Sequence, residues 1–259
     1  MVALVIGVGI SLLDRVLHAV VVIGTLVVIK FLLVRRRKTR EEKARAAGLP
    51  PGMVRESPYF RLVRGLAVTD LGGVHEGYMA RPGEGDLTQL TANVSAERLA
   101  EVILALAAEV REPSVLILDV PAREAAPREP GRAGSLCRDV FEMDHMTHAR
   151  FASFFRRHAE VLVHDGHTWL WYGTGDGREY VLVGMMKVVR IGTDDPHKFM
   201  RVLDGLGYEE EPELHTATDN LSKENPAFAQ MIDVRGRTVY DVVEALKRDG
   251  LYLLERREA

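Results

Sequence analysis

The sequence predicts an α+β protein that begins with a transmembrane helix and continues as a cytosolic part with a mixed sheet. Three observations lead to this class: an 18-residue apolar run ends at a basic cluster, several segments repeat apolar residues at helical spacing, and short β-like runs lie between them. We predict a membrane anchor with a basic juxtamembrane helix, a small α/β subdomain, a mobile linker or loop, and an α+β domain, at residues 1–48, 53–120, 121–136 and 137–259.

The anchor is predicted from the apolar run between Leu17 and Val34. At about 1.5 Å per residue this run forms a helix roughly 27 Å long, close to the ~30 Å hydrocarbon core of a bilayer. Basic residues follow the run instead of preceding it, which is opposite to the order in a signal peptide. The positive-inside rule then predicts a single-pass protein with its N terminus outside, its soluble part in the cytoplasm, and four cations at the membrane surface, Arg35, Arg36, Arg37 and Lys38.

The residues before the span leave three interpretations open. Asp14 and Arg15 interrupt an apolar stretch, and a charged residue at the centre of a bilayer costs about 2.5 to 3.5 kcal/mol. The first 13 residues therefore lie in the outer interface, protrude as a continuation of the helix, or pack against a partner helix, and in the last case residues 1–34 also serve oligomerisation. A buried core helix is the alternative interpretation of the whole apolar run.

Charge is divided unevenly along the chain. Residues 1–45 hold nine basic and three acidic side chains, so with a total of −3 the remaining residues carry a net charge of −9. An acidic soluble part disfavours nucleic acid as a partner, because phosphate binding needs clustered Lys and Arg. The single cysteine, Cys137, rules out an intrachain disulfide and is typical of a reducing compartment.

Beyond a turn at Gly48 to Gly52, the pattern predicts strands at 59–68 and 74–80 and a helix that Ser95 caps. The apolar run 115–120 then predicts a strand buried on both faces. Asp119 stands near the end of this strand, where acids bind ligands in open α/β sheets, although an aspartate there also forms turns.

Residues 121–135 show no apolar periodicity and lead into a second group of elements. A ferredoxin-like β-α-β-β-α-β unit is predicted for about 138–216, from a strand at 138–143, a helix at 147–163, strands at 168–172 and 179–191, a helix that opens at Asp194, and an extended segment at 208–216. The glycines between 173 and 177 lie between two strands, so they predict a hairpin turn and not a phosphate loop. A helix capped by Thr238 and a strand at 251–254 complete the chain.

Histidines are concentrated between residues 144 and 167, where Asp144 and Asp165 accompany them. Histidine and carboxylate side chains are ligands for zinc, so a metal site could be built from His145, His148, His164 and His167. The first two begin the predicted helix and the last two follow it, roughly 25 Å away at 1.5 Å per residue. Solvated or capping histidines are therefore the alternative interpretation.

Trp169 and Trp171 alternate along one predicted strand and share a face, where they form either a core or a binding surface. Together with Asp119 they are the predicted binding residues. The sequence shows no glycine-rich phosphate loop or nucleophile motif, so we expect a membrane-tethered module that binds or regulates another protein and needs no cofactor. The alternative is a membrane-anchored, metal-dependent enzyme, a hydrolase, that uses segment 144–167 to bind zinc or another divalent ion.

Overall fold

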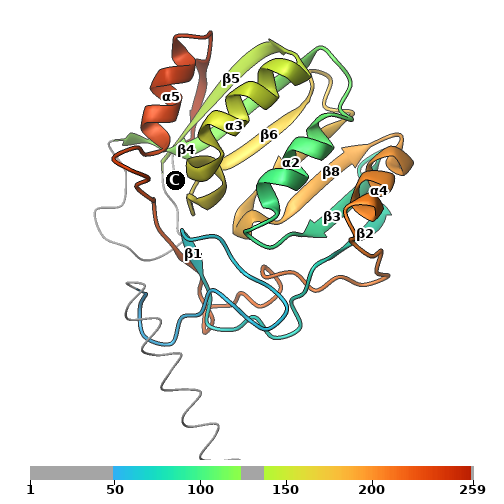
Figure 1. Ribbon diagram of the computed structural model, residues 1–259, viewed down its shortest axis with the longest axis vertical. Coiled ribbons are helices and arrows are strands. Elements are labelled where there is room, and N and C mark those ends of the chain that lie inside the picture. The colour runs from blue at the N-terminus through green and yellow to red at the C-terminus, as the bar shows by residue number, and fades with distance from the viewer. Residues whose placement is uncertain (1–48, 124–136, 258–259) are drawn as a thin grey trace, which may run out of the picture. The chain divides into compact units, whose positions relative to one another are not determined.

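The structure is a computed structural model that describes residues 49–123 and 137–257 (Figure 1). Its contacts divide the chain into two compact units, residues 1–52 and 53–259, and all described helices and strands belong to the second unit. The predicted span, the basic residues at 35–38 and the oligomerisation segment 1–34 lie outside the described residues. Within the described ranges, no helix has the length and hydropathy needed to cross a membrane.

The predicted α+β class is confirmed by one large sheet with helices packed on it. Every neighbouring pair in this eight-stranded sheet is antiparallel. Its strands are, in spatial order, β10 (Tyr252–Arg257), β5 (Arg138–Met146), β4 (Ser114–Pro121), β6 (Trp169–Thr174), β7 (Tyr180–Val183), β8 (Val189–Thr193), β3 (Thr88–Asn93) and β2 (Gly77–Pro82). A separate two-stranded sheet pairs β1 (Leu66–Ala67) with β9 (Phe228–Ala229).

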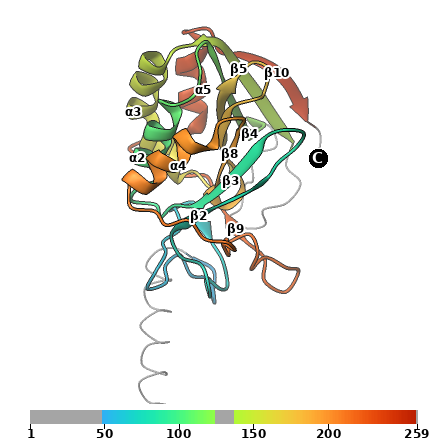
Figure 2. The same cartoon turned by 90° about the vertical axis from the view of Figure 1, so that its right-hand side faces the viewer.

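The helices form a row on one face of the large sheet (Figures 1 and 2). In spatial order they are α5 (Val239–Lys247), α3 (His148–His164), α2 (Leu99–Ala107) and α4 (Pro196–Gly205). The core lies between this row and the sheet. Because side chains alternate along a strand, Leu116 and Leu118 of β4 face the helices and are fully buried, whereas Ile117 between them points to the other face.

Helix α3 follows directly from the local sequence. The Thr147 side chain caps it by accepting a hydrogen bond from the Arg150 backbone N–H at 3.3 Å. Phe151 and Phe155 are buried, and the Phe151 ring stacks on Tyr172 of the sheet with centroids 4.2 Å apart. The helix spans residues 148–164, so the sequence placed it correctly to within one residue at each end.

Two features of the 138–216 segment differ from the ferredoxin-like prediction. Strand β4, from outside the segment, lies between β5 and β6 and pairs with both. The single strand predicted at 179–191 is two strands, β7 and β8, which a 3₁₀ turn at Met185–Lys187 joins into a hairpin. In that turn Met186 and Lys187 both adopt positive φ, and the chain reverses its direction there. The apolar periodicity alone predicts one continuous strand through these residues.

Strand β4 also joins the predicted 53–120 and 137–259 segments into one sheet, so no break in the fold separates them. At one edge of the sheet, Tyr78 of β2 donates its backbone N–H to Glu209 O at 3.0 Å and accepts from Glu211 N at 2.7 Å. Residues 208–216 thus cover an edge through an isolated parallel bridge instead of forming a full strand. At the other edge, all six residues of β10 are exposed.

Candidate binding face

The face of the sheet opposite the helices carries a group of partly exposed aromatic and apolar side chains. Figure 2 shows that no described helix lies on this side. Direct cross-strand partners point to the same face, and the register aligns Ile117 with Trp171, Trp171 with Leu182, and Leu182 with Arg190 across four strands. We call this surface the open face and define it by Ile117, Trp169, Trp171, Tyr180, Leu182 and Arg190, all of which are partly buried.

Two glycines make room for an aromatic stack at its centre. The rings of Trp171 and Tyr180 are stacked, with centroids 5.9 Å apart and planes 25° apart. Tyr180 pairs across the strands with Gly173 and Gly192. A Cβ at Gly192 would lie 2.3 Å from Tyr180 Cε1, and one at Gly173 would lie 2.8 Å from Trp171 Cη2. The rings therefore lie close over the backbone of neighbouring strands, which only glycine permits.

The three residues predicted to bind a ligand meet on this side of the sheet. Asp119 is the cross-strand neighbour of Trp169, which shares its face with Trp171. The Arg138 guanidinium lies 5.2 Å from the centroid of the Trp169 ring and donates from Nε to Asp119 Oδ1 at 2.5 Å. Asp119 is buried and engaged in this ion pair, so it holds Arg138 against Trp169 and leaves less of its carboxylate for a ligand.

Arg190 is a member of the open face that the sequence did not single out. Its side chain forms no hydrogen bond, ion pair or ring contact with any residue of the described ranges. A Cβ built on Gly184 would lie 4.0 Å from Arg190 Nη1 and 3.8 Å from Leu182 Cγ, which places the guanidinium beside the end of β7. The pairing of Leu170 with Val183 makes Trp169 the next neighbour of Gly184 on β6. Arg190 belongs to β8, but its unpaired guanidinium lies beside the end of β7, which is the strand next to that of the tryptophans.

The predicted metal ligands lie at opposite ends of α3. His145 is exposed on β5 at a positive φ of 51°, and His148 begins the helix with its Nδ1 3.4 Å from Glu112 Oε1. His164 and His167 lie at the other end. Across residues 49–123 and 137–257, no group of three His, Cys, Asp or Glu side chains is arranged to hold a metal ion.

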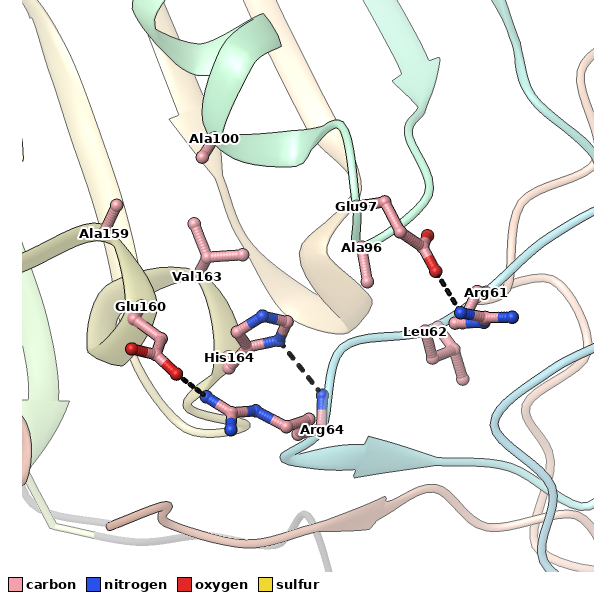
Figure 3. A pocket seen from close by; sticks show the side chains of 10 residues that line it. All are labelled: Arg61, Leu62, Arg64, Ala96, Glu97, Ala100, Ala159, Glu160, Val163 and His164. Carbon is pink, nitrogen blue, oxygen red and sulfur yellow. Dashed lines mark hydrogen bonds and ion pairs between the residues drawn. The ribbon is translucent and has the colours of Figure 1, made fainter. Parts of the chain in front are cut away.

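His164 lines a cleft of about 340 Å³ between α2, α3 and residues 61–64 (Figure 3). Its Nδ1 accepts the backbone N–H of Arg64 at 3.3 Å, and burial followed by the nearby Arg64 charge lowers its pKa, so the ring is a neutral acceptor. The charged side chains on the rim pair with one another: Arg64 contacts Glu160 at 3.0 Å, and Arg61 contacts Glu97. With its charges matched internally, the cleft has less to offer a ligand than the open face.

His167 belongs to a buried polar cluster below the start of β6. Asp165 Oδ1 accepts from the backbone N–H groups of His167 and Thr168 at 3.0 and 2.9 Å. Lys187 is fully enclosed and donates from Nζ to Leu162 O at 3.1 Å and to Thr168 O at 2.6 Å. Burial lowers the pKa of His167 and brings that of Lys187 to about 8. This cluster ties the end of α3 to the turn between β7 and β8.

Comparisons of the chain with protein-family models, curated proteins and solved structures yield no significant match.

Proposed function

We propose that this protein is a membrane-tethered, cytosolic protein-binding module that docks its partner on the open face. The observation that carries the proposal is the residue composition of that surface. It holds both tryptophans of the chain, a tyrosine and an arginine, the residue types that contribute most binding energy at protein interfaces. The tryptophans present large, rigid rings that lose little side-chain entropy when a partner binds.

The large sheet supports such docking because it holds these side chains on rigid strands. Trp171 is positioned from below by Gly173 and laterally by Tyr180, and Trp169 is positioned by the Arg138–Asp119 pair. A surface that is ordered before binding pays less entropy on association. The apolar run 17–34 and the cations at 35–38 support the second part of the proposal, a single-pass anchor that keeps the module at the cytoplasmic surface of the membrane.

Site-specific photo-cross-linking in native membranes tests the docking surface. With a benzophenone amino acid at Leu182, which lies on the open face, we expect one discrete adduct with another protein. The same probe at Tyr59, which is 75% exposed, is the matched control and should yield no such adduct. Trp171→Ala in the Leu182 probe variant should remove the adduct, because it deletes the central ring. Equal adducts at both positions, or adducts unaffected by Trp171→Ala, would contradict the proposal.

A further inference from the structure

We infer that Arg190 makes the open face selective for a carboxylate. The open face binds a protein segment in which one aspartate or glutamate is flanked by apolar side chains. This inference rests on the proposed function and names the chemistry of the partner. Two observations carry the inference. The Arg190 guanidinium has no partner among the described residues, and it lies beside Leu182 and Gly184 of the β7 segment, next to the strand that holds Trp169 and Trp171.

The two cations around Asp119, next to Trp169, are already engaged. Arg138 donates from Nε to Asp119 Oδ1 at 2.5 Å, and its Nη2 donates to Asp119 O at 2.9 Å and to His167 O at 2.7 Å. Arg257 lies 3.7 Å from Asp119 Oδ2 and also pairs with Glu255. Arg190 therefore differs from its neighbours in having its hydrogen-bond donors available for a ligand.

An acidic side chain satisfies this arginine best. A guanidinium presents parallel N–H groups that match the two oxygens of a carboxylate, and such charge-assisted pairs are roughly twice as strong as neutral hydrogen bonds. The surrounding Leu182, Trp169 and Trp171 exclude water once a partner covers them, and an ion pair strengthens as the local dielectric constant falls. The apolar flanks of the segment would pack on these rings, so affinity and charge selectivity come from adjacent parts of the same surface.

The test uses full-length protein in detergent and three acetylated, amidated peptides. Each has two leucine and two phenylalanine residues around a central aspartate, asparagine or lysine, so the central residue is the only difference. Both tryptophans of the chain lie on this side of the sheet, so their fluorescence reports binding there directly. We expect the aspartate peptide to bind at least tenfold more tightly than the asparagine peptide at low salt, and the lysine peptide to bind more weakly than both.

Substitution of the arginine separates charge selectivity from docking. Arg190→Met keeps the apolar stem, so it should abolish the preference for aspartate while the asparagine peptide still binds. Arg190→Lys should retain part of the preference, because an ammonium lacks the paired donors of a guanidinium. Arg156→Met is the matched control: Arg156 is exposed on α3, which covers the opposite face of the sheet, so this substitution should leave the preference unchanged.

Each contrary result has a distinct meaning. Equal binding of the aspartate and asparagine peptides to the unmodified protein would overturn the carboxylate specificity but leave the docking surface, which the cross-linking tests independently. If the preference for the aspartate peptide persists in Arg190→Met, another group binds the carboxylate, and the assignment to Arg190 would be wrong. Arg190-dependent binding to phosphatidylserine vesicles, with no peptide bound, would identify a lipid surface as the occupant and would also overturn the inference.

Discussion

Lys187 is the residue whose position is least expected from its type. Its side chain is buried, and among the described residues the charge of opposite sign that acts on it is that of Asp165, whose Oδ1 is occupied by backbone and hydroxyl donors. Burial is the main cause that brings its pKa from 10.5 to about 8, while Arg138 adds repulsion. Below about pH 8 the fold therefore carries a buried ammonium, which two main-chain carbonyls solvate.

This burial predicts a specific pH dependence of stability. Between about pH 8 and pH 10 the unfolded chain retains the Lys187 proton that the folded protein has lost, so the free energy of unfolding should rise with pH. The full difference in pKa corresponds to roughly 3 kcal/mol. Lys187→Met removes the group that titrates, so the difference in unfolding free energy between the two proteins should change across this range. Urea denaturation at several pH values measures it.

The matched control for this experiment is Lys247→Met. Lys247 is an exposed lysine in an i,i+3 pair with Glu244 on α5. Its stability difference from the unmodified protein should stay constant over the same pH range. If Lys187→Met were also independent of pH, the ammonium would not be buried at an unfavourable cost, and the arrangement at the end of α3 would need revision.

The β6–β7–β8 meander forms the centre of the open face. Its strands place Trp171, Tyr180 and Leu182 on one side while Tyr172 and Val181 enter the core on the other. The meander is held to the helices by a buried carboxylate. Glu179, which is 1% exposed, accepts the Arg111 backbone N–H at 2.6 Å and pairs with Lys198 at 2.7 Å. This hydrogen-bonded ion pair between a buried carboxylate and a partly buried lysine fixes the hairpin relative to α4.

Gly192→Ala tests whether glycine is needed under the aromatic stack. The added Cβ would lie 2.3 Å from Tyr180 Cε1, so the ring must move and its stacking on Trp171 must change. We expect a shift in tryptophan emission and a loss of about 1 to 3 kcal/mol of stability. Gly175→Ala is the control in the neighbouring turn, because its nearest contact would be Val115 Cγ2 at an ordinary 3.7 Å. Unchanged emission from Gly192→Ala would mean that the stack is not held by this close approach.

The large sheet is built from strands of both halves of the chain. Strand β4 pairs with β5 and β6, and β3 pairs with β8, so the order in space differs from the order in sequence. One face of this sheet is covered by the row of the four described helices, and the other carries the open face. The helical core and the proposed docking surface thus occupy opposite sides of the same strands.

The single cysteine makes the proposed membrane topology directly measurable. Cys137 precedes β5 and is partly exposed. If the N terminus is outside and the soluble part is cytoplasmic, a membrane-impermeant maleimide should label intact cells only after permeabilisation. Cys137→Ser should remove the label in both conditions. Labelling of intact cells would place residue 137 outside and reverse the proposed orientation.

Local sequence patterns predicted the class of the fold and most of its helices and strands. The alternation of apolar and polar residues indicated that Trp169 and Trp171 share a face, and the apolar stripe placed α3 to within one residue at each end. These features depend on side chains a few positions apart, so they can be recognised from a linear pattern. The prediction of a membrane anchor also uses a local pattern, because it depends on the length and composition of one continuous apolar run.

The arrangement of those elements relative to one another became visible in three dimensions. The placement of β4 between β5 and β6, the pairing of Asp119 with Arg138, and the stack of Tyr180 on Trp171 join segments that are distant or ambiguous in sequence. The lack of a partner for the Arg190 side chain among the described residues was equally hidden, because whether an arginine is paired depends on every chain segment that surrounds it. A linear pattern shows which face a side chain occupies, whereas its neighbours across the sheet follow from strand order and register.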